Sequence, residues 1–165
     1  MSLPSASHET GPIRMSLSSR FENIETAQHL CGKLLEGWDL NEETTHWILM
    51  ALREALANAI KHGNQQNPAK QVHVDLMVEN DELVIRVEDE GVGFDPGKVR
   101  DPLAPENLLN RNGRGILFMH KFMDHIHYGS KPDGGTVVTL RRRVPGPQTD
   151  IPSEQTSLDP EEGTE

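Results

Sequence analysis

Two polar residues, Glu54 and Asn58, stand four positions apart in the segment 51–64, ALREALANAIKHGN. The apolar residues of this segment recur at helical spacing: Leu52, Ala55, Leu56, Ala59 and Ile60. Because positions i and i+4 share one face of a helix, the carboxylate and the carboxamide are expected side by side along the border of the apolar stripe. Such a pair of oxygens can bind a metal ion, orient a water molecule or simply face solvent, and all three readings are open at this point.

A second carboxylate, Asp89, ends a predicted strand over 83–89. The inward positions of this strand are Leu83, Ile85 and Val87. Continuing the alternation puts Asp89 on the apolar face of the sheet, where a carboxylate needs a donor, and a ligand amino group would serve. Gly91 and Gly93 follow, and their lack of side chains would let a flat ring lie against the backbone. The alternative is an ordinary turn in which the two glycines only supply positive φ angles.

A third cluster lies before an apolar run that predicts a helix over 115–124, and it consists of Arg111, Gly113, Arg114 and Gly115. Backbone N–H groups beside glycines and the positive end of a helix dipole attract anions, and the two arginines add positive charge. A glycine pair before a helix is also typical of a flexible hinge. The stretch 95–112, which contains several prolines, is predicted to be a mobile lid over a ligand.

The elements that must position these residues alternate between helical and strand patterns. Strands are predicted over 13–17, 71–79, 83–89, 125–130 and 135–144, and two further helices over 18–38 and from about residue 42 to 63. Helices that alternate with hairpins favour an α+β fold, a two-layer α/β sandwich whose mixed, mostly antiparallel sheet carries its helices on one face. Ser19 with Glu22 predicts a capping box for the first of these helices, Asp39 with Glu42 starts the second, and Gly63 ends it.

Composition narrows the classes of function. The chain of 165 residues has 35% hydrophobic residues and a formal net charge of -10, which suits one domain but not a surface that binds nucleic acid or an anionic membrane. The single cysteine, Cys31, allows no internal disulfide, and no apolar run reaches the ~20 residues of a membrane span, so a cytoplasmic protein is expected. Residues 1–12 and the acidic 145–165 are predicted to be disordered tails that flank one domain over 13–144.

The polar and glycine-rich segments together resemble a known family. REALANAIKHGN resembles the N box, VEDEGVGFDP and NGRGILF the two glycine boxes, and GGTVVTL the final strand signature of the GHKL ATPase and kinase superfamily. All four occur in the family order. The short chain and the wording of the N box are most similar to bacterial anti-sigma factor serine/threonine kinases of the SpoIIAB/RsbW type, which use the HATPase_c-like ATP-binding (Bergerat) fold.

The resemblance implies roles for the three polar residues. Asn58 matches the asparagine that ligates Mg²⁺, Glu54 the acid proposed as general base, and Asp89 the aspartate that accepts the adenine amino group. The other nucleotide-binding positions that it implies are Gly91, Gly93, Arg111, Gly113, Arg114, Gly115 and Thr136. A strand-end hydrogen bond or packing explains Thr136 equally well. His62 fits either the border of the ATP site or a helix end whose dipole it complements.

Proteins of this type bind Mg-ATP, hold a sigma factor inactive and phosphorylate an anti-anti-sigma protein with a STAS domain. The resemblance therefore implies ATP and Mg²⁺ as cofactors, these two proteins as partners, and a homodimer formed through the N-terminal strand and helix. Two alternatives remain open: a regulatory module that binds ATP and a partner without phosphoryl transfer, and the catalytic domain of a histidine kinase. The segment before Arg53 is short for the phosphoacceptor hairpin that the last of these would need.

Overall fold

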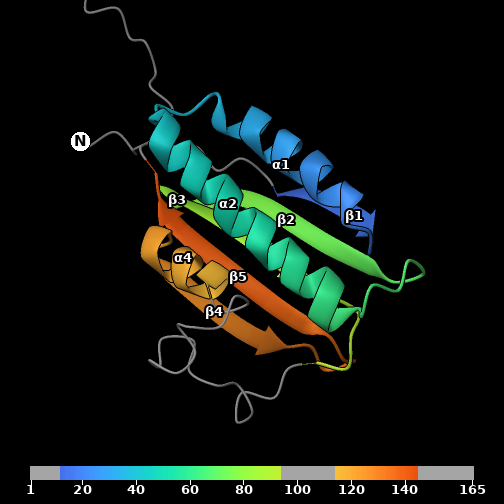
Figure 1. Cartoon of the computed structure of the whole chain (residues 1–165). Helices are drawn as coiled ribbons and strands as arrows, with labels where there is room; N and C mark the ends of the chain where they lie inside the picture. Colours follow the sequence, from blue (N-terminus) through green and yellow to red (C-terminus); the bar gives the residue numbers. More distant parts are fainter. Residues whose placement is uncertain (1–11, 94–113, 145–165) are drawn as a thin grey trace, which may run out of the picture.

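The protein forms two layers, a five-stranded sheet and a layer of helices packed on one face of it (Figure 1). The computed structural model describes residues 12–93 and 114–144. The strands are β1 (Ile13–Ser18), β2 (Gln71–Glu79), β3 (Glu82–Glu88), β4 (His125–Ser130) and β5 (Thr136–Arg143). The helices are α1 (Glu22–Leu35), α2 (Glu42–Asn58), the π-helical turn η1 (Ala59–Gly63) that continues α2, and α4 (Arg114–Phe122). The predicted α+β sandwich is confirmed.

The strands pair in the order β1-β2-β3-β5-β4, and each of these pairings is antiparallel. Both predicted hairpins are present. Asn80 and Asp81 link β2 to β3 with positive φ angles of 51° and 62°, the backbone that a two-residue turn needs and that these two residue types tolerate. The sheet therefore brings the start of β5 beside the end of β3, where Asp89 follows.

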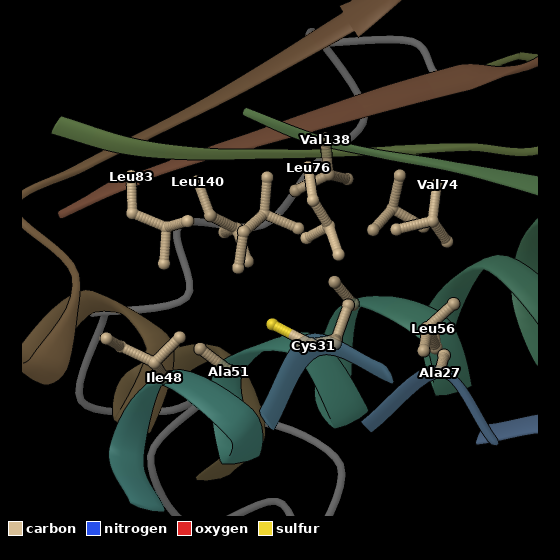
Figure 2. Packing of buried hydrophobic residues seen from close by; sticks show 14 of the residues in the cluster. Ala27, Cys31, Ile48, Ala51, Leu56, Val74, Leu76, Leu83, Val138 and Leu140 are labelled. Carbon is tan, nitrogen blue, oxygen red and sulfur yellow. The ribbon is translucent and has the colours of Figure 1, made fainter. Parts of the chain in front are cut away.

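The core lies between the sheet and the helices. Figure 2 shows side chains of the sheet facing those of the helices, with Val74, Leu76, Leu83, Val138 and Leu140 opposite Ala27, Cys31, Ile48, Ala51 and Leu56. The predicted alternation of inward residues along β2 and β3 is confirmed by their burial. Burial also raises the pKa of Cys31 to about 12, which makes it an unreactive core thiol.

Helix α2 lies along the middle of the helical layer, between α1 and α4 (Figure 1). Its buried residues recur at helical spacing and are Ile48, Ala51, Leu52, Ala55 and Leu56. Glu54 and Asn58 fall at the border of this stripe and are half-buried. At its first turns, the ring of Trp47 stacks on Phe122 of α4 at 3.7 Å between centroids, which makes Trp47 an anchor between the two helices.

The residues predicted to cap the N-termini of α1 and α2 do not cap them. Ser19 does not cap α1, because it is buried and its Oγ accepts a hydrogen bond of 2.6 Å from Nδ2 of Asn64. The N-cap of α2 is Asn41, whose Oδ1 accepts a 2.7 Å hydrogen bond from the backbone N–H of Thr44. Asp39 stands two residues too early for this role, so the helix begins at Glu42 with a different cap from the one predicted.

Several predictions concern residues outside the described ranges. They are the tails over 1–12 and 145–165 and the lid over 95–112. Of these residues, only Pro12 is described. The domain boundaries at 13 and 144 therefore stay a prediction. Among the described residues, no helix is both long enough and apolar enough to cross a membrane.

Replacing the observed cap should destabilise the fold. Asn41→Ala removes the acceptor for the first turn of α2 and is expected to lower the free energy of unfolding by about 1 kcal/mol, measured by urea denaturation. Arg53→Ala, an exposed substitution on the same helix, serves as the control and is expected to change it by less than about 0.5 kcal/mol. Equal effects of the two substitutions would contradict the assignment of Asn41 as the cap.

Candidate functional site

Asp89 is a buried carboxylate just past the end of β3, with 4% of its surface exposed. The backbone N–H groups of Gly91 and Thr136 both donate to its Oδ1, over 2.9 and 3.0 Å. Its own N–H donates to the carbonyl of Thr136 over 3.0 Å. The inward placement predicted from the alternation of β3 is thus observed. Both of these bonds use Oδ1, and a carboxylate oxygen such as Oδ2 is itself able to accept a hydrogen bond.

Three glycines allow the backbone to close around Asp89. A Cβ at Gly63 would overlap the Asp89 carboxylate, one at Gly91 would overlap the carbonyl of Gly63, and one at Gly135 would overlap the carbonyl of Asp89. Gly93 adopts a positive φ of 93°, as a turn requires, but Gly91 is needed for space. The reading in which both glycines only supply positive φ angles is therefore wrong for Gly91.

Glu54 projects from α2 toward the first turn of α4. A Cβ at Gly115 would overlap its carboxylate, so glycine at this position lets the two elements meet. Burial raises the pKa of Glu54 above its usual 4.5, and the nearby positive charges of His62, Arg53 and Lys61 oppose this rise only in part. Burial first, and then the charge of Glu54, raise the pKa of Tyr128 on β4. Glu54 is thus a poorly solvated carboxylate with an enhanced affinity for a proton.

Asn58 is the last residue of α2 and is half-buried, one turn beyond Glu54. The π-helical turn η1 follows at once and ends at Gly63, which lies against Asp89. Single π turns inside helices occur frequently at functional sites. Within the described ranges, no three His, Cys, Asp or Glu residues are grouped to hold a metal ion, and the amide oxygen of Asn58 is of the ligand type that Mg²⁺ accepts.

The remaining predicted positions divide into those the structure places and those it does not. Thr136 reaches Asp89 through its backbone, so the strand-end hydrogen bond weighed for it is present. His62 is exposed at the end of η1. Arg111 and Gly113 lie outside the described residues, as does the side chain of Arg114 at the start of α4.

Sequence reasoning missed Asn64. This residue is fully buried, and its side chain bonds to three separate segments of the chain. No signal in the sequence marked it, because a polar side chain directly after the glycine that ends a helix is expected in solvent and not in the interior.

The fold has two layers, and the glycine-lined carboxylate of Asp89 lies beside the end of the helix that carries Glu54 and Asn58. This is the arrangement of a GHKL-type ATP-binding domain. Comparison with known proteins agrees. The family model of the histidine kinase-like ATPase domain matches residues 17–142. The chain belongs to this family.

Two relatives within the family are both anti-sigma F factors. An anti-sigma F factor of Oceanobacillus iheyensis is 30% identical over 136 residues, which cover 80% of this chain and 92% of that protein. One from Bacillus velezensis is 34% identical over 136 residues, with the same two coverages of 80% and 92%. The crystal structure of the RsbU and RsbW domains of a Mycobacterium tuberculosis protein shares the fold, with a TM-score of 0.59 and 17% identity. That match covers 82% of this chain but 32% of the other, longer one.

The residues present fit a nucleotide. Oδ2 of Asp89 can accept an amino group, and the neighbouring glycines Gly63, Gly91 and Gly135 add no side chain beside it. The first turn of α4 lies next to Glu54 and offers backbone N–H groups to an anion. The adenine end and the phosphate end of ATP would thus be received by different strands and helices at one end of α2.

Asp89→Asn is expected to weaken binding of Mg-ATP by roughly 10- to 100-fold, because a charged acceptor contributes about 1.5–3 kcal/mol in a desolvated pocket. Calorimetric titration of the folded variant measures the affinity, and thermal denaturation checks that its stability falls by less than its affinity. Glu90→Gln, one residue further on and exposed, is the matched control. Unchanged ATP affinity in Asp89→Asn would remove Asp89 from the site.

Proposed function

We propose that this protein is an ATP-dependent protein serine/threonine kinase and anti-sigma regulatory factor that phosphorylates an anti-anti-sigma partner with a STAS domain. Its membership of the histidine kinase-like ATPase family supports the use of ATP. The anti-sigma F factors that it resembles over 80% of its length support the regulatory role.

ATP and Mg²⁺ are the proposed cofactors. Asp89 receives the adenine amino group, with Gly91 and Gly93 beside the base and Thr136 fixing the carboxylate from β5. Asn58 supplies the protein ligand to Mg²⁺, which when bound neutralises charge on the phosphate oxygens. The positions proposed to contact the phosphates are Arg111, Gly113, Arg114 and Gly115.

The observation that carries the catalytic part of the proposal is the setting of Glu54. Its carboxylate is half-buried against Gly115 at the start of α4, one helical turn from Asn58. The raised pKa means that Glu54 holds a proton more readily than a solvated glutamate does. It is therefore suited to accept the proton of a serine or threonine hydroxyl that is held near the phosphates.

The proposed partners are the STAS-domain substrate and a sigma factor, and the protein is proposed to act as a cytoplasmic homodimer. Assembly through β1 and α1 is supported by the place of β1 at the edge of the sheet. It is also supported by Ile13, Phe21 and Leu30, which are large apolar residues of this region with 42 to 44% of their surface exposed.

Glu54→Gln is expected to keep nucleotide and partner binding but to lower phosphoryl transfer by about 10²-fold. This is the low end of the usual range for a general base, since a loose transition state needs less help from a base. Single-turnover transfer from labelled ATP to the STAS-domain partner measures the rate. Asn58→Ala is the contrasting variant and is expected to lose Mg-ATP affinity itself.

Wild-type rates in Glu54→Gln would end the assignment of the base. A wild-type protein that binds ATP and its partner but never transfers phosphate would favour the alternative, a regulatory module without kinase activity.

The substitution Glu54→Gln should not destabilise the fold at neutral pH. Because the pKa of Glu54 is raised above 4.5 in the folded protein, the folded state binds this proton more tightly than the unfolded state does. The stability that this contributes is present below pH 4.5 and is lost as the pH rises through the folded pKa. Glu54→Gln should therefore gain stability relative to the wild type between about pH 4 and about pH 7.5. Thermal denaturation at both pH values tests this, and a relative loss at the higher pH would contradict it.

A further inference from the structure

Asn64 joins three segments of the chain that are far apart in sequence. Its Nδ2 donates to Oγ of Ser19 over 2.6 Å and to the carbonyl of Gln71 over 2.8 Å. Its Oδ1 accepts the backbone N–H of Glu90 over 2.8 Å. The side chain is fully buried, and its bond to Ser19 lies wholly in the interior, where water does not compete for it.

These bonds fix the two backbones that meet at Asp89. Asn64 follows Gly63, which lies against the Asp89 carboxylate, and Glu90 follows Asp89 itself. On the other side, the backbone N–H of Asp89 donates to the carbonyl of Thr136, and the N–H of Thr136 donates to Oδ1 of the Asp89 side chain. The position of the carboxylate relative to the end of α2 is therefore set from both sides, by Thr136 and by Asn64.

The loop after Asn64 holds an uncommon backbone. Gln65 and Gln66 have φ angles of 53° and 57°, in the left-handed region that side chains other than glycine, Asn and Asp rarely adopt. Two such residues in succession persist only where the surroundings dictate them. The backbone N–H of Gln66 donates to the carbonyl of Ile60 over 2.7 Å, and the Asn64 side chain joins the start of the loop to Gln71 at its far end.

We infer that Asn64 is a positioning residue that sets the preference of this site for a base with an exocyclic amino group. It acts through Asp89 and does not contact the base itself. The inference rests on the proposed function, because it takes Asp89 as the acceptor of that amino group.

The test compares two nucleotides, ATP and purine riboside triphosphate, which lacks only the 6-amino group. The ratio of their dissociation constants, measured by calorimetry with Mg²⁺, reports the contact with Asp89 and not the general integrity of the site. The wild type is expected to prefer ATP by about tenfold or more, as a hydrogen bond to a charged acceptor provides. Asn64→Ala is expected to reduce this preference at least about threefold, whereas a purely structural role would weaken both nucleotides equally.

A matched variant sharpens the result. Asn67→Ala is the matched control, since Asn67 lies in the same loop, is exposed and bonds only locally to Ala69 through its side chain, and it should leave the preference unchanged. If circular dichroism shows that Asn64→Ala does not fold, Ser19→Ala replaces it, because it removes one partner of the amide while Asn64 stays in place.

Suppose that Asp89→Asn removes the preference for ATP, but Asn64→Ala (or Ser19→Ala in its place) leaves it at the wild-type value. That result overturns this inference and leaves the proposed function standing. A wild type that binds both nucleotides equally would refute the adenine role of Asp89, and this inference with it.

Discussion

The burial of the Asp89 carboxylate is the constraint on which the rest of the site depends. A carboxylate with 4% of its surface exposed must be met by donors, and two backbone N–H groups, from Gly91 and Thr136, meet one of its oxygens. This requires β5 to lie directly beside β3 and the residues after β3 to turn back on themselves. The sheet order, in which β5 is inserted between β3 and β4, satisfies the first requirement.

Helix α2 supplies the other half of the site because its apolar stripe fixes its rotation. Ile48, Leu52 and Leu56 are buried against the sheet, and this places Glu54 at the border of the apolar stripe. There the carboxylate meets Gly115 and loses solvent, which raises its pKa. The packing that raises the affinity of Glu54 for a proton thus opposes its ionisation in the folded protein, so the catalytic role proposed for this residue would come at a cost in stability.

Much of this arrangement could be predicted from the sequence, because periodicity reports burial directly. The alternation along β2 and β3 predicted the inward face of the sheet, including Asp89, and the spacing in α2 predicted the place of Glu54 beside Asn58. Helix caps were predicted less well. Ser19 has the right residue type and spacing for a capping box, but a partner 45 positions along the chain, Asn64, takes its hydroxyl, and local sequence carries no trace of that contact. The sequence also did not predict that Gly63 and Gly135 leave space for Asp89, since Asp89 becomes their neighbour only in the folded chain.

Nucleotide is proposed to bind at the end of α2 that carries Glu54 and Asn58 and that continues through η1 to Gly63, which lies against Asp89. Titration of Mg-ATP into ¹⁵N-labelled protein, followed by NMR, tests it most directly, because each backbone N–H group reports on its own surroundings. The largest shift changes are expected at Gly63, Gly91 and Thr136, with little change at the opposite end of α2 around Trp47. Changes centred on Trp47 and Phe122, or none at Gly91 and Thr136 at saturating ATP, would contradict it.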